Sequence, residues 1–216
     1  MKHYGFFRSS AAFRLRIALN LKGVAAEPVL VNFARQEQLG PSYRSVNPQA
    51  RVPSLVLDDG TVLIQSLAII EWLDETHPNP PFLPKDANGR ARVRGLANLI
   101  ACDIHPLNNI SVLNYLRDKL QVPEPARNEW YRHWVAQGFA AFEALLADSS
   151  DTGIFCHGDT PGLADVCLVP QVFNAQRYEC PLGEYPTLMR VFEACMKLGA
   201  FDDAQPMKQP EAAFIK

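Results

Sequence analysis

Two adjacent serines, Ser9 and Ser10, stand between the first extended segment and the first helical segment that the sequence predicts. The free N–H groups and the positive dipole end at the start of a helix stabilise an anion placed there. A serine hydroxyl that donates to sulfur lowers the pKa of a thiol, because a hydrogen bond to a charged group contributes about 1.5 to 3 kcal/mol. This position therefore suits a thiolate. Ordinary helix capping by serine is the alternative interpretation.

Two further pairs of residues suit a peptide-like anion. Val52-Pro53 opens a predicted strand, although proline removes a ladder donor and is normally kept off central strands. A cis Pro53 would turn the backbone groups of Val52 outward to pair with such a ligand, and a trans proline at a strand start is the alternative. Gln65-Ser66 starts a helix directly after a strand, where the pair either binds a carboxylate or only caps the helix.

The first third of the chain predicts a compact α/β domain that would position these three pairs. Extended and helical signals alternate in the order β-α-β-α-β-β-α. The expected elements are strands at 3–7, 27–32, 52–57 and 61–64, helices at 11–22 and 66–73, and some helical structure in the polar stretch up to residue 48. This order indicates a sheet that mixes parallel and antiparallel strands.

A proline-rich segment from His77 to Pro84 cannot continue a helix and marks a domain boundary. Beyond it the strand signals vanish and helical periodicity takes over. The predicted apolar stripe of this region contains Trp130, Trp134, Gly138, Ala141 and Leu145, widened by Phe139 and Phe142. We therefore expect an α/β domain at 1–80 and an all-helical domain at 88–216.

The composition excludes several classes of protein. With 21 Lys and Arg against 23 Asp and Glu, the net charge of -2 provides no general basic field for nucleic acid or an anionic membrane. The five cysteines form no C-x-x-C pair, which argues against a metal site, and their odd number favours reduced thiols over disulfides. No segment approaches ~18 apolar residues, and no secretory apolar core develops at the N-terminus. These features predict a cytoplasmic protein that holds any anionic substrate with locally placed arginines.

Four short motifs occur in order along the whole chain. They are Ser9-Ser10-x-x-Phe13-Arg14-x-Arg16, Asn47-Pro48-x-x-x-Val52-Pro53, Gln65-Ser66-x-Ala68-Ile69 and Leu163-Ala164-Asp165. Together they resemble the zeta class of glutathione transferases, which contains the maleylacetoacetate and maleylpyruvate isomerases. The resemblance implies a thioredoxin-like N-terminal domain that binds glutathione, an all-helical C-terminal domain that supplies most of the second-substrate pocket, and a homodimer.

The resemblance also assigns roles in glutathione binding. Ser9 or Ser10 would contact the sulfur of glutathione. Val52, before a cis Pro53, would pair with the cysteinyl backbone. The γ-glutamyl carboxylate would be bound by Gln65 and Ser66.

The same resemblance assigns roles at the second substrate, a small dicarboxylate. Arg8 would face this substrate, and Arg177 would reach its carboxylates. His105 and Asn109 match a segment that borders the glutathione site. For His105 a structural role is the alternative, and for Arg177 a solvated helix face.

This sequence departs from the pattern of the class at three places. Ala11 stands where a cysteine usually follows the two serines, which removes a thiol and leaves serine activation intact. Gly162, three residues before Asp165, lacks the usual hydroxyl, so half of a capping box is missing at a cost of a few tenths of a kcal/mol. Ile110 follows Asn109 where the maleylpyruvate branch carries an extra arginine, which favours a maleylacetoacetate substrate.

The resemblance implies an enzyme that converts maleylacetoacetate to fumarylacetoacetate in aromatic amino-acid catabolism, with glutathione returned and no metal required. A maleylpyruvate isomerase, or a glutathione transferase acting more broadly on small electrophiles, is the first alternative. The second alternative is a glutathione-transferase-like binding module without turnover, because one fold hosts many functions.

Overall fold

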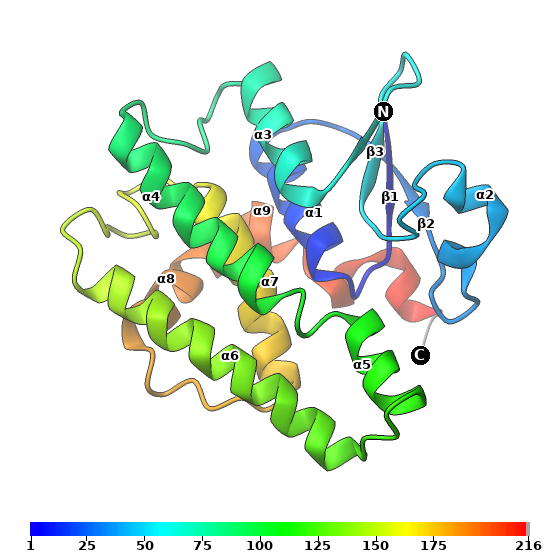
Figure 1. The fold of residues 1–216 in the computed structure, drawn as a ribbon. Coiled ribbons are helices and arrows are strands. Elements are labelled where there is room, and N and C mark those ends of the chain that lie inside the picture. Colours follow the sequence, from blue (N-terminus) through cyan, green and yellow to red (C-terminus); the bar gives the residue numbers. More distant parts are fainter. Residues whose placement is uncertain (215–216) are drawn as a thin grey trace. The chain divides into compact units, whose positions relative to one another are not determined.

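The structure is a computed structural model that describes residues 1–214 (Figure 1). The chain divides into two units. The first unit comprises Met1–Phe82 together with the segment from Lys197 onward, and the second comprises Leu83–Met196. Both units contain buried hydrophobic residues.

A four-stranded sheet forms the centre of the first unit. Its strands are β1 (Lys2–Gly5), β2 (Glu27–Leu30), β3 (Ser54–Val56) and β4 (Val62–Ile64), in the order β2-β1-β3-β4. β1 and β2 are parallel, whereas β3 pairs antiparallel with both β1 and β4. The predicted mixed sheet is confirmed, with strands one to three residues shorter than the expected ranges.

Two main helices complete the α/β part of the first unit. α1 (Ser10–Lys22) is buried on most sides, and Gly23 ends it at a φ of 63°, a left-handed conformation that glycine adopts without a steric penalty. α3 (Ser66–Thr76) buries Ile69, Ile70 and Leu73. Between β2 and β3 lie only the short helices η1 (Glu37–Leu39) and α2 (Pro41–Arg44).

A buried ion pair links α1 to α3. The Nζ of Lys22 lies 2.7 Å from Asp74 Oδ1, and the Lys22 side chain is completely buried. The ammonium group also lies 4.1 Å from the centre of the Phe82 ring, and it donates to the carbonyl oxygen of Pro80. These contacts satisfy a charge that burial would otherwise make costly.

The end of the chain belongs to the first unit. α9 (Gly199–Asp202), η3 (Pro206–Lys208) and η4 (Pro210–Ala213) follow the second unit in sequence. Arg16 Nε donates to the carbonyl oxygen of Ala204 at 2.9 Å, and Asn20 Nδ2 donates to that of Ala200 at 3.0 Å. The expected helical domain, 88–216, included this segment, whereas the structure assigns it to the first unit. Helical periodicity shows that a segment is a helix but does not show which core the helix packs on.

Helices form all of the regular structure described in the second unit. They are α4 (Ala87–Asn98), the π-helix η2 (Leu99–Ile104), α5 (Ile110–Asp118), α6 (Glu124–Ala147), α7 (Leu163–Arg177) and α8 (Pro186–Met196). The expectation of an all-helical second domain is thereby confirmed. Within the described residues, no helix is long and apolar enough to cross a membrane.

The predicted apolar stripe of α6 is wrong by about one residue. The helix buries Tyr131, Val135, Phe139, Phe142 and Leu146. Only the two phenylalanines of the expected set are fully buried, and Leu145 is 51% exposed. The prediction followed the helix face that carries the two tryptophans, because their large apolar area dominates the hydrophobic periodicity.

Asp165 holds the start of α7 in the core of the second unit. Its Oδ2 accepts from the backbone N–H of Gly162 at 2.8 Å, and its Oδ1 accepts from that of Cys156 at 2.9 Å. Burial raises the pKa of Asp165. Gly162 has no side chain that could accept a hydrogen bond, so only the half of the capping box made by Asp165 is present, as expected.

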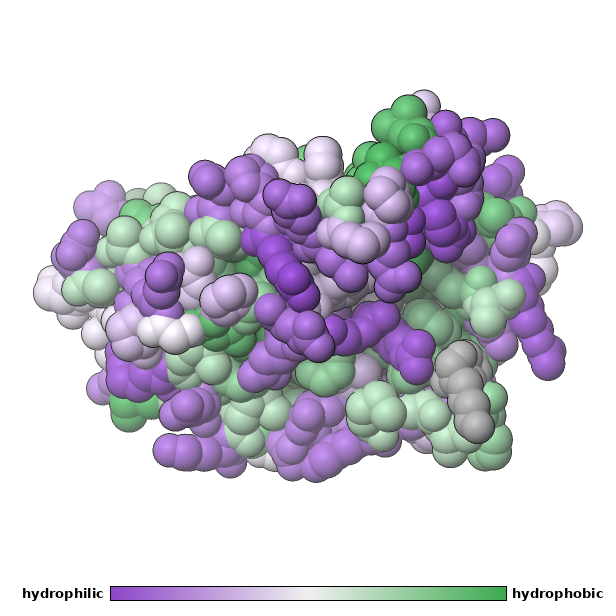
Figure 2. Space-filling model, turned by 90° about the horizontal axis from the view of Figure 1, so that it is seen from below, coloured by the Kyte–Doolittle hydropathy of each residue, from purple (hydrophilic) through white to green (hydrophobic). Residues whose placement is uncertain are grey.

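Several elements among the described residues expose large apolar side chains. On the face drawn in Figure 2, hydrophilic side chains separate small hydrophobic areas. Exposed large side chains such as Leu39, Tyr115 and Met207 come from different parts of the sequence. Scattered residues of this kind are normal on a folded protein.

Candidate functional site

The register of the sheet brings the three N-terminal pairs to one edge. Tyr4 lies opposite Ser54, and Ser54 lies opposite Ile64. The end of β1, the start of β3 and the end of β4 therefore meet at the same edge. The segments that adjoin this edge are Ser9-Ser10, Val52-Pro53 and Gln65-Ser66.

Ser9 is the N-cap residue of α1. Its Oγ accepts from the backbone N–H of Ala12 at 3.2 Å, and its own N–H donates to the carbonyl oxygen of Phe6 at 2.9 Å. Because the hydroxyl oxygen is the acceptor in this cap, the hydroxyl proton is left for a second partner. Capping and donation to an anion are therefore compatible at Ser9.

Ser10 and Arg8 differ from Ser9 in their exposure. Ser10 is the first residue of α1 and is only 5% exposed, whereas Ser9 is half-buried. Arg8 is exposed, with its guanidinium carbon 5.0 Å from the centre of the Phe7 ring. Of the two serines, Ser9 has the more accessible hydroxyl.

The peptide bond between Val52 and Pro53 is cis, as one of the two sequence interpretations predicted. No hydrogen bond of the Val52 backbone occurs to another residue within 1–214. The preceding loop is held by two donors to the carbonyl oxygen of Arg51, the Tyr43 hydroxyl at 2.7 Å and Asn47 Nδ2 at 2.8 Å. The backbone N–H and C=O of Val52 are thus fixed in place and available to a peptide-like ligand.

Gln65 adopts an unusual backbone conformation before α3. Its φ of 70° and ψ of 115° are sparsely populated by residues other than glycine, and such strain tends to occur at functional sites. The Gln65 Nε2 donates to Gln49 Oε1 at 2.8 Å. The side chain is thereby held at the N-terminus of a helix, where a carboxylate is stabilised.

Ser66 is buried at the first position of α3. Its Oγ accepts a hydrogen bond of 3.4 Å from Nη1 of Arg14, which is itself buried in α1. This contact leaves the Ser66 proton for an acceptor and places a positive charge behind the hydroxyl. Arg14, Gln49 and Tyr43 support the site, and sequence analysis assigned them no role because each acts through a partner distant in sequence.

His105 and Asn109 lie next to each other in the second unit. Nδ2 of Asn109 and Nε2 of His105 are 3.5 Å apart, a distance at the limit for a hydrogen bond. Asn109 caps α5 by accepting from the backbone N–H of Ser111 at 3.0 Å. The neighbouring Asn108 donates from Nδ2 to the carbonyl oxygen of Tyr131 at 3.3 Å. The contact with Ser111 gives Asn109 a structural role as a helix cap, in addition to any role at a ligand.

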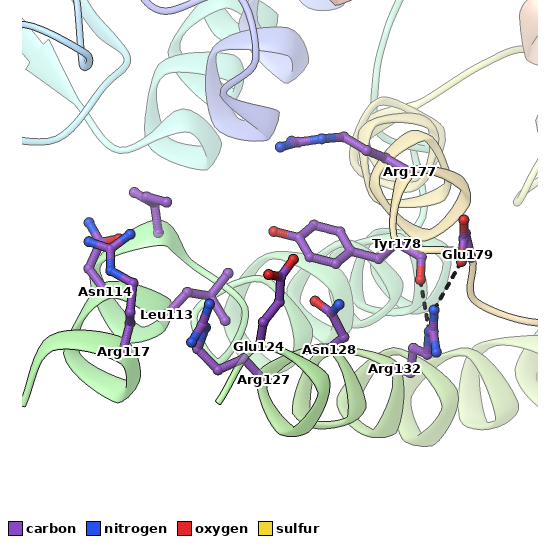
Figure 3. A pocket seen from close by; sticks show the side chains of 11 residues that line it. Leu113, Asn114, Arg117, Glu124, Arg127, Asn128, Arg132, Arg177, Tyr178 and Glu179 are labelled. Carbon is purple, nitrogen blue, oxygen red and sulfur yellow. Dashed lines mark hydrogen bonds and ion pairs between the residues drawn. The ribbon is translucent and has the colours of Figure 1, made fainter. Parts of the chain in front are cut away.

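Arg177 lines a polar pocket of about 410 Å³ within the second unit (Figure 3). The pocket is bounded by α5, the beginning of α6 and the end of α7. Its lining residues are Ile110, Leu113, Asn114, Arg117, Glu124, Arg127, Asn128, Arg132, Arg177, Tyr178 and Glu179. Sequence analysis identified Arg177 here and missed its neighbours on α5 and α6.

The donor set at the sheet edge suits an anionic peptide and not a metal ion. Within residues 1–214 there is no group of three or more His, Cys, Asp or Glu side chains that could hold a metal. Two helix N-termini, two serine hydroxyls and the free backbone N–H of Val52 supply N–H and O–H donors instead. An anion with several acceptors fits this set.

Two family models match the chain. The model for the glutathione S-transferase N-terminal domain covers residues 8–76, and the model for the C-terminal domain of the same family covers residues 128–194. The chain therefore belongs to the glutathione S-transferase family.

Individual relatives narrow the class. The maleylpyruvate isomerase of a Ralstonia species is 50% identical over 99% of this chain and 100% of its own length. The maleylacetoacetate isomerase of Pseudomonas aeruginosa is 47% identical over 98% of both chains.

Solved structures agree with these relatives. One is a maleylpyruvate isomerase described as a bacterial zeta-class enzyme, with a TM-score of 0.95 and 49% identity over 98% of this chain and 99% of its own. Another is the maleylacetoacetate isomerase of Methylobacterium extorquens with bound malonate and glutathione, with a TM-score of 0.94 and 40% identity over 97% of this chain and 98% of its own. The chain is thus a zeta-class member with the fold expected from its sequence.

Proposed function

We propose that this protein is a glutathione-dependent cis-trans isomerase that converts maleylacetoacetate to fumarylacetoacetate. The main observation behind this proposal is that Ser9, Val52 and Gln65 lie at the same edge of the sheet. A backbone or hydroxyl donor is present at each of the three positions. This edge presents in one place the groups that a thiolate, a peptide backbone and a carboxylate require.

The described residues fit glutathione. Ser66, backed by Arg14, and the strained Gln65 would hold the γ-glutamyl carboxylate at the N-terminus of α3. The N–H and C=O of Val52 would pair with the cysteinyl backbone, in the manner of an added strand. Ser9 would donate its free hydroxyl proton to the sulfur.

When bound, glutathione supplies a thiolate that adds reversibly to the cis double bond, so that rotation and elimination give the trans product. The contribution of the protein is to hold this thiol in its charged form at neutral pH. A hydrogen bond from Ser9 of about 1.5 to 3 kcal/mol corresponds to a thiol pKa lower by about one to two units. The dipole of α1 acts in the same direction.

Arg8 and Arg177 would bind the carboxylates of the substrate, which explains how a chain with a net charge of -2 binds a dianion. The relatives are named for two maleyl substrates, and Ile110 is the feature that favours maleylacetoacetate here. We place the reaction in aromatic amino-acid catabolism, in the cytoplasm, and expect the protein to act as a homodimer.

The proposal is tested by turnover of maleylacetoacetate and maleylpyruvate with and without glutathione. We expect isomerisation of both only with glutathione, and a higher kcat/KM for maleylacetoacetate. A halogenated acid in the same panel detects a transferase of broader specificity. Glutathione binding without isomerisation of either diacid would show that the protein is not an isomerase.

A further inference from the structure

Arg16 belongs to the first sequence motif, yet the proposed chemistry gives it no part. It lies in α1, about two helical turns after Ser9, and its side chain is half-buried. Burial lowers the pKa of Arg16 to about 10, whereas the nearby charge of Glu211 raises it. The guanidinium is therefore charged at neutral pH, and a charge away from water needs acceptors.

The acceptors of Arg16 are two backbone carbonyls of the first unit. Nη2 donates to the carbonyl oxygen of Phe7 at 3.1 Å, and Nε donates to that of Ala204 at 2.9 Å. Phe7 and Ala204 are both buried. The planar fork of a guanidinium suits two acceptors that lie side by side. One side chain therefore joins the C-terminal segment to the loop between β1 and α1.

This loop, residues 6–9, carries Arg8 and Ser9. The N–H of Ser9 donates to the carbonyl oxygen of Phe6 at 2.9 Å, which closes a tight turn. The Phe7 carbonyl belongs to the peptide group that leads into Arg8, and no other donor to it is found within residues 1–214. Arg16 thus fixes the orientation of the peptide group directly before the serine. A hydroxyl proton must be aligned with its acceptor, so rotation of this peptide group would weaken donation by Ser9.

The C-terminal segment supplies a firm support on the other side of Arg16. α9 packs on α1, and Phe201 of α9 is completely buried. Asn20, one helical turn after Arg16, also holds this segment, because its Nδ2 donates to the carbonyl oxygen of Ala200 at 3.0 Å. Asn20 has no printed contact with loop 6–9, whereas Arg16 contacts both the segment and the loop. The two side chains therefore separate anchoring of the segment from support of the loop.

We propose that Arg16 is a positioning residue for thiolate formation. It holds the peptide group between Phe7 and Arg8 against the C-terminal segment, so that the hydroxyl proton of Ser9 points at the sulfur of glutathione. Arg16 acts through these backbone groups and not by contact with glutathione. The inference rests on the proposed function and extends the thiol-activating part of the site to residues near the end of the chain.

Arg16→Met tests this role, because it removes both hydrogen bonds and keeps an unbranched side chain. The pKa of the bound glutathione thiol should rise by about one unit, and turnover at neutral pH should fall about tenfold. The ultraviolet absorbance of the thiolate, followed against pH, measures the pKa. At about pH 5, where the thiol is protonated in both proteins, the Kd for glutathione should change less than about twofold, since Val52, Gln65 and Ser66 are untouched. A general loosening of the site would change both quantities.

Arg16→Lys separates position from charge, and it also serves if Arg16→Met does not fold. Lysine keeps the positive charge, but a single ammonium group does not reproduce the fork that spans both carbonyls. The thiol pKa of this variant should therefore stay close to that of Arg16→Met. Recovery of the wild-type thiol pKa in Arg16→Lys would show that the charge alone acts on the thiol, and the positioning role would be wrong.

Asn20→Ala is the matched control, because it removes a donor to the same segment and leaves the contact with Phe7 in place. Its thiol pKa should equal the wild-type value. An unchanged thiol pKa in Arg16→Met, or an equal rise in Asn20→Ala, would overturn the role of Arg16 alone. If the wild-type protein does not bind glutathione, or binds it without lowering its thiol pKa, the proposed function itself has failed, and the inference fails with it.

Discussion

Ser9 and Ser10 are neighbours in sequence, yet the structure gives them different chemistry. The hydroxyl oxygen of Ser9 caps α1 and its proton is free, whereas Ser10 is buried one position further into the helix. From the sequence the two are equivalent, because both are hydroxyl residues at a predicted helix start. The distinction depends on where the helix begins, which is the least certain part of a sequence prediction.

We therefore predict that Ser9→Ala impairs thiolate formation more than Ser10→Ala. The pKa of bound glutathione should rise by about one to two units in Ser9→Ala, and turnover at pH 7 should fall about 10- to 100-fold. The ultraviolet absorbance of the bound thiolate, measured against pH, gives the pKa directly. Denaturant unfolding of both variants separates this effect from the loss of a cap, which costs about 1 kcal/mol. A larger thiol pKa shift in Ser10→Ala would assign the sulfur contact to that residue instead.

His3 makes the first unit sensitive to acid. Burial, and then the nearby charge of Arg16, lower the pKa of His3 to about 3, and its Nε2 has no hydrogen-bond partner within the described residues. The unfolded chain takes up this proton near pH 6.5, whereas the folded chain does not. Stability is therefore complete above pH 6.5 and falls as the pH drops from 6.5 towards 3.

This linkage predicts that His3→Gln weakens the acid sensitivity. At pH 5 the histidine costs the wild-type protein about 2 kcal/mol relative to pH 7.5, at about 1.36 kcal/mol per pH unit below 6.5. The free energy of unfolding of the variant should depend less on pH between 5 and 7 than that of the wild type. His133→Gln, at an exposed position, is the control. Equal pH dependence in His3→Gln and the wild type would show that folding does not lower the pKa of His3.

At the scale of elements, the sequence predicted the type and order of the N-terminal strands and helices correctly. Turn residues and alternating apolar residues mark these elements locally, as Gly23 does at the end of α1. The apolar face of α6 was predicted about one residue off, and the π-helix η2 was not predicted. The π-helix has an i to i-5 hydrogen bond, as from His105 N to Ile100 O at 3.0 Å, which no local residue pattern specifies.

The packing of α6 on this π-helix explains Gly138. A Cβ atom at residue 138 would lie 2.2 Å from Ile104 Cδ1, so Gly138→Ala forces the isoleucine to move. We expect this variant to lose about 1 to 2 kcal/mol in the free energy of unfolding, because overpacking outweighs the higher helix propensity of alanine. Thermal and denaturant unfolding measure the change.

Gly95→Ala in α4 is the matched control, since no atom other than the adjoining backbone of its own helix lies within 4 Å of the added Cβ. It should gain up to about 1 kcal/mol from helix propensity alone. Combining Gly138→Ala with Ile104→Val should recover part of the loss. Equal effects at the two glycines would mean that α6 does not pack on Ile104 in this way.

At the scale of the whole molecule, the division of the chain was predicted less well than its elements. The division after Phe82 falls inside the proline-rich segment 77–84, where prolines are a local signal that a helix cannot continue. The return of the last helices to the first unit depends on contacts such as Arg16 with Ala204, between residues almost a whole chain apart. Sequence patterns contain no information on that pairing.

The C-terminal segment should therefore contribute strongly to the stability of the first unit. Phe201 in α9 is completely buried, so Phe201→Ala is expected to cost about 3 to 5 kcal/mol in the free energy of unfolding. Met207→Ala, at a side chain that is 64% exposed, should change stability by no more than about 0.5 kcal/mol. A loss below 1 kcal/mol for Phe201→Ala would show that α9 is not part of this core.

The position of this segment also has a consequence for synthesis on the ribosome. A domain completed by its own consecutive residues can fold while the rest of the chain is still being made. Here the partners of Arg16 and Asn20 are Ala204 and Ala200, which are translated after the whole second unit. The sheet that carries Ser9 is therefore made first, but the unit around it reaches its final packing only after the whole second unit has been synthesised.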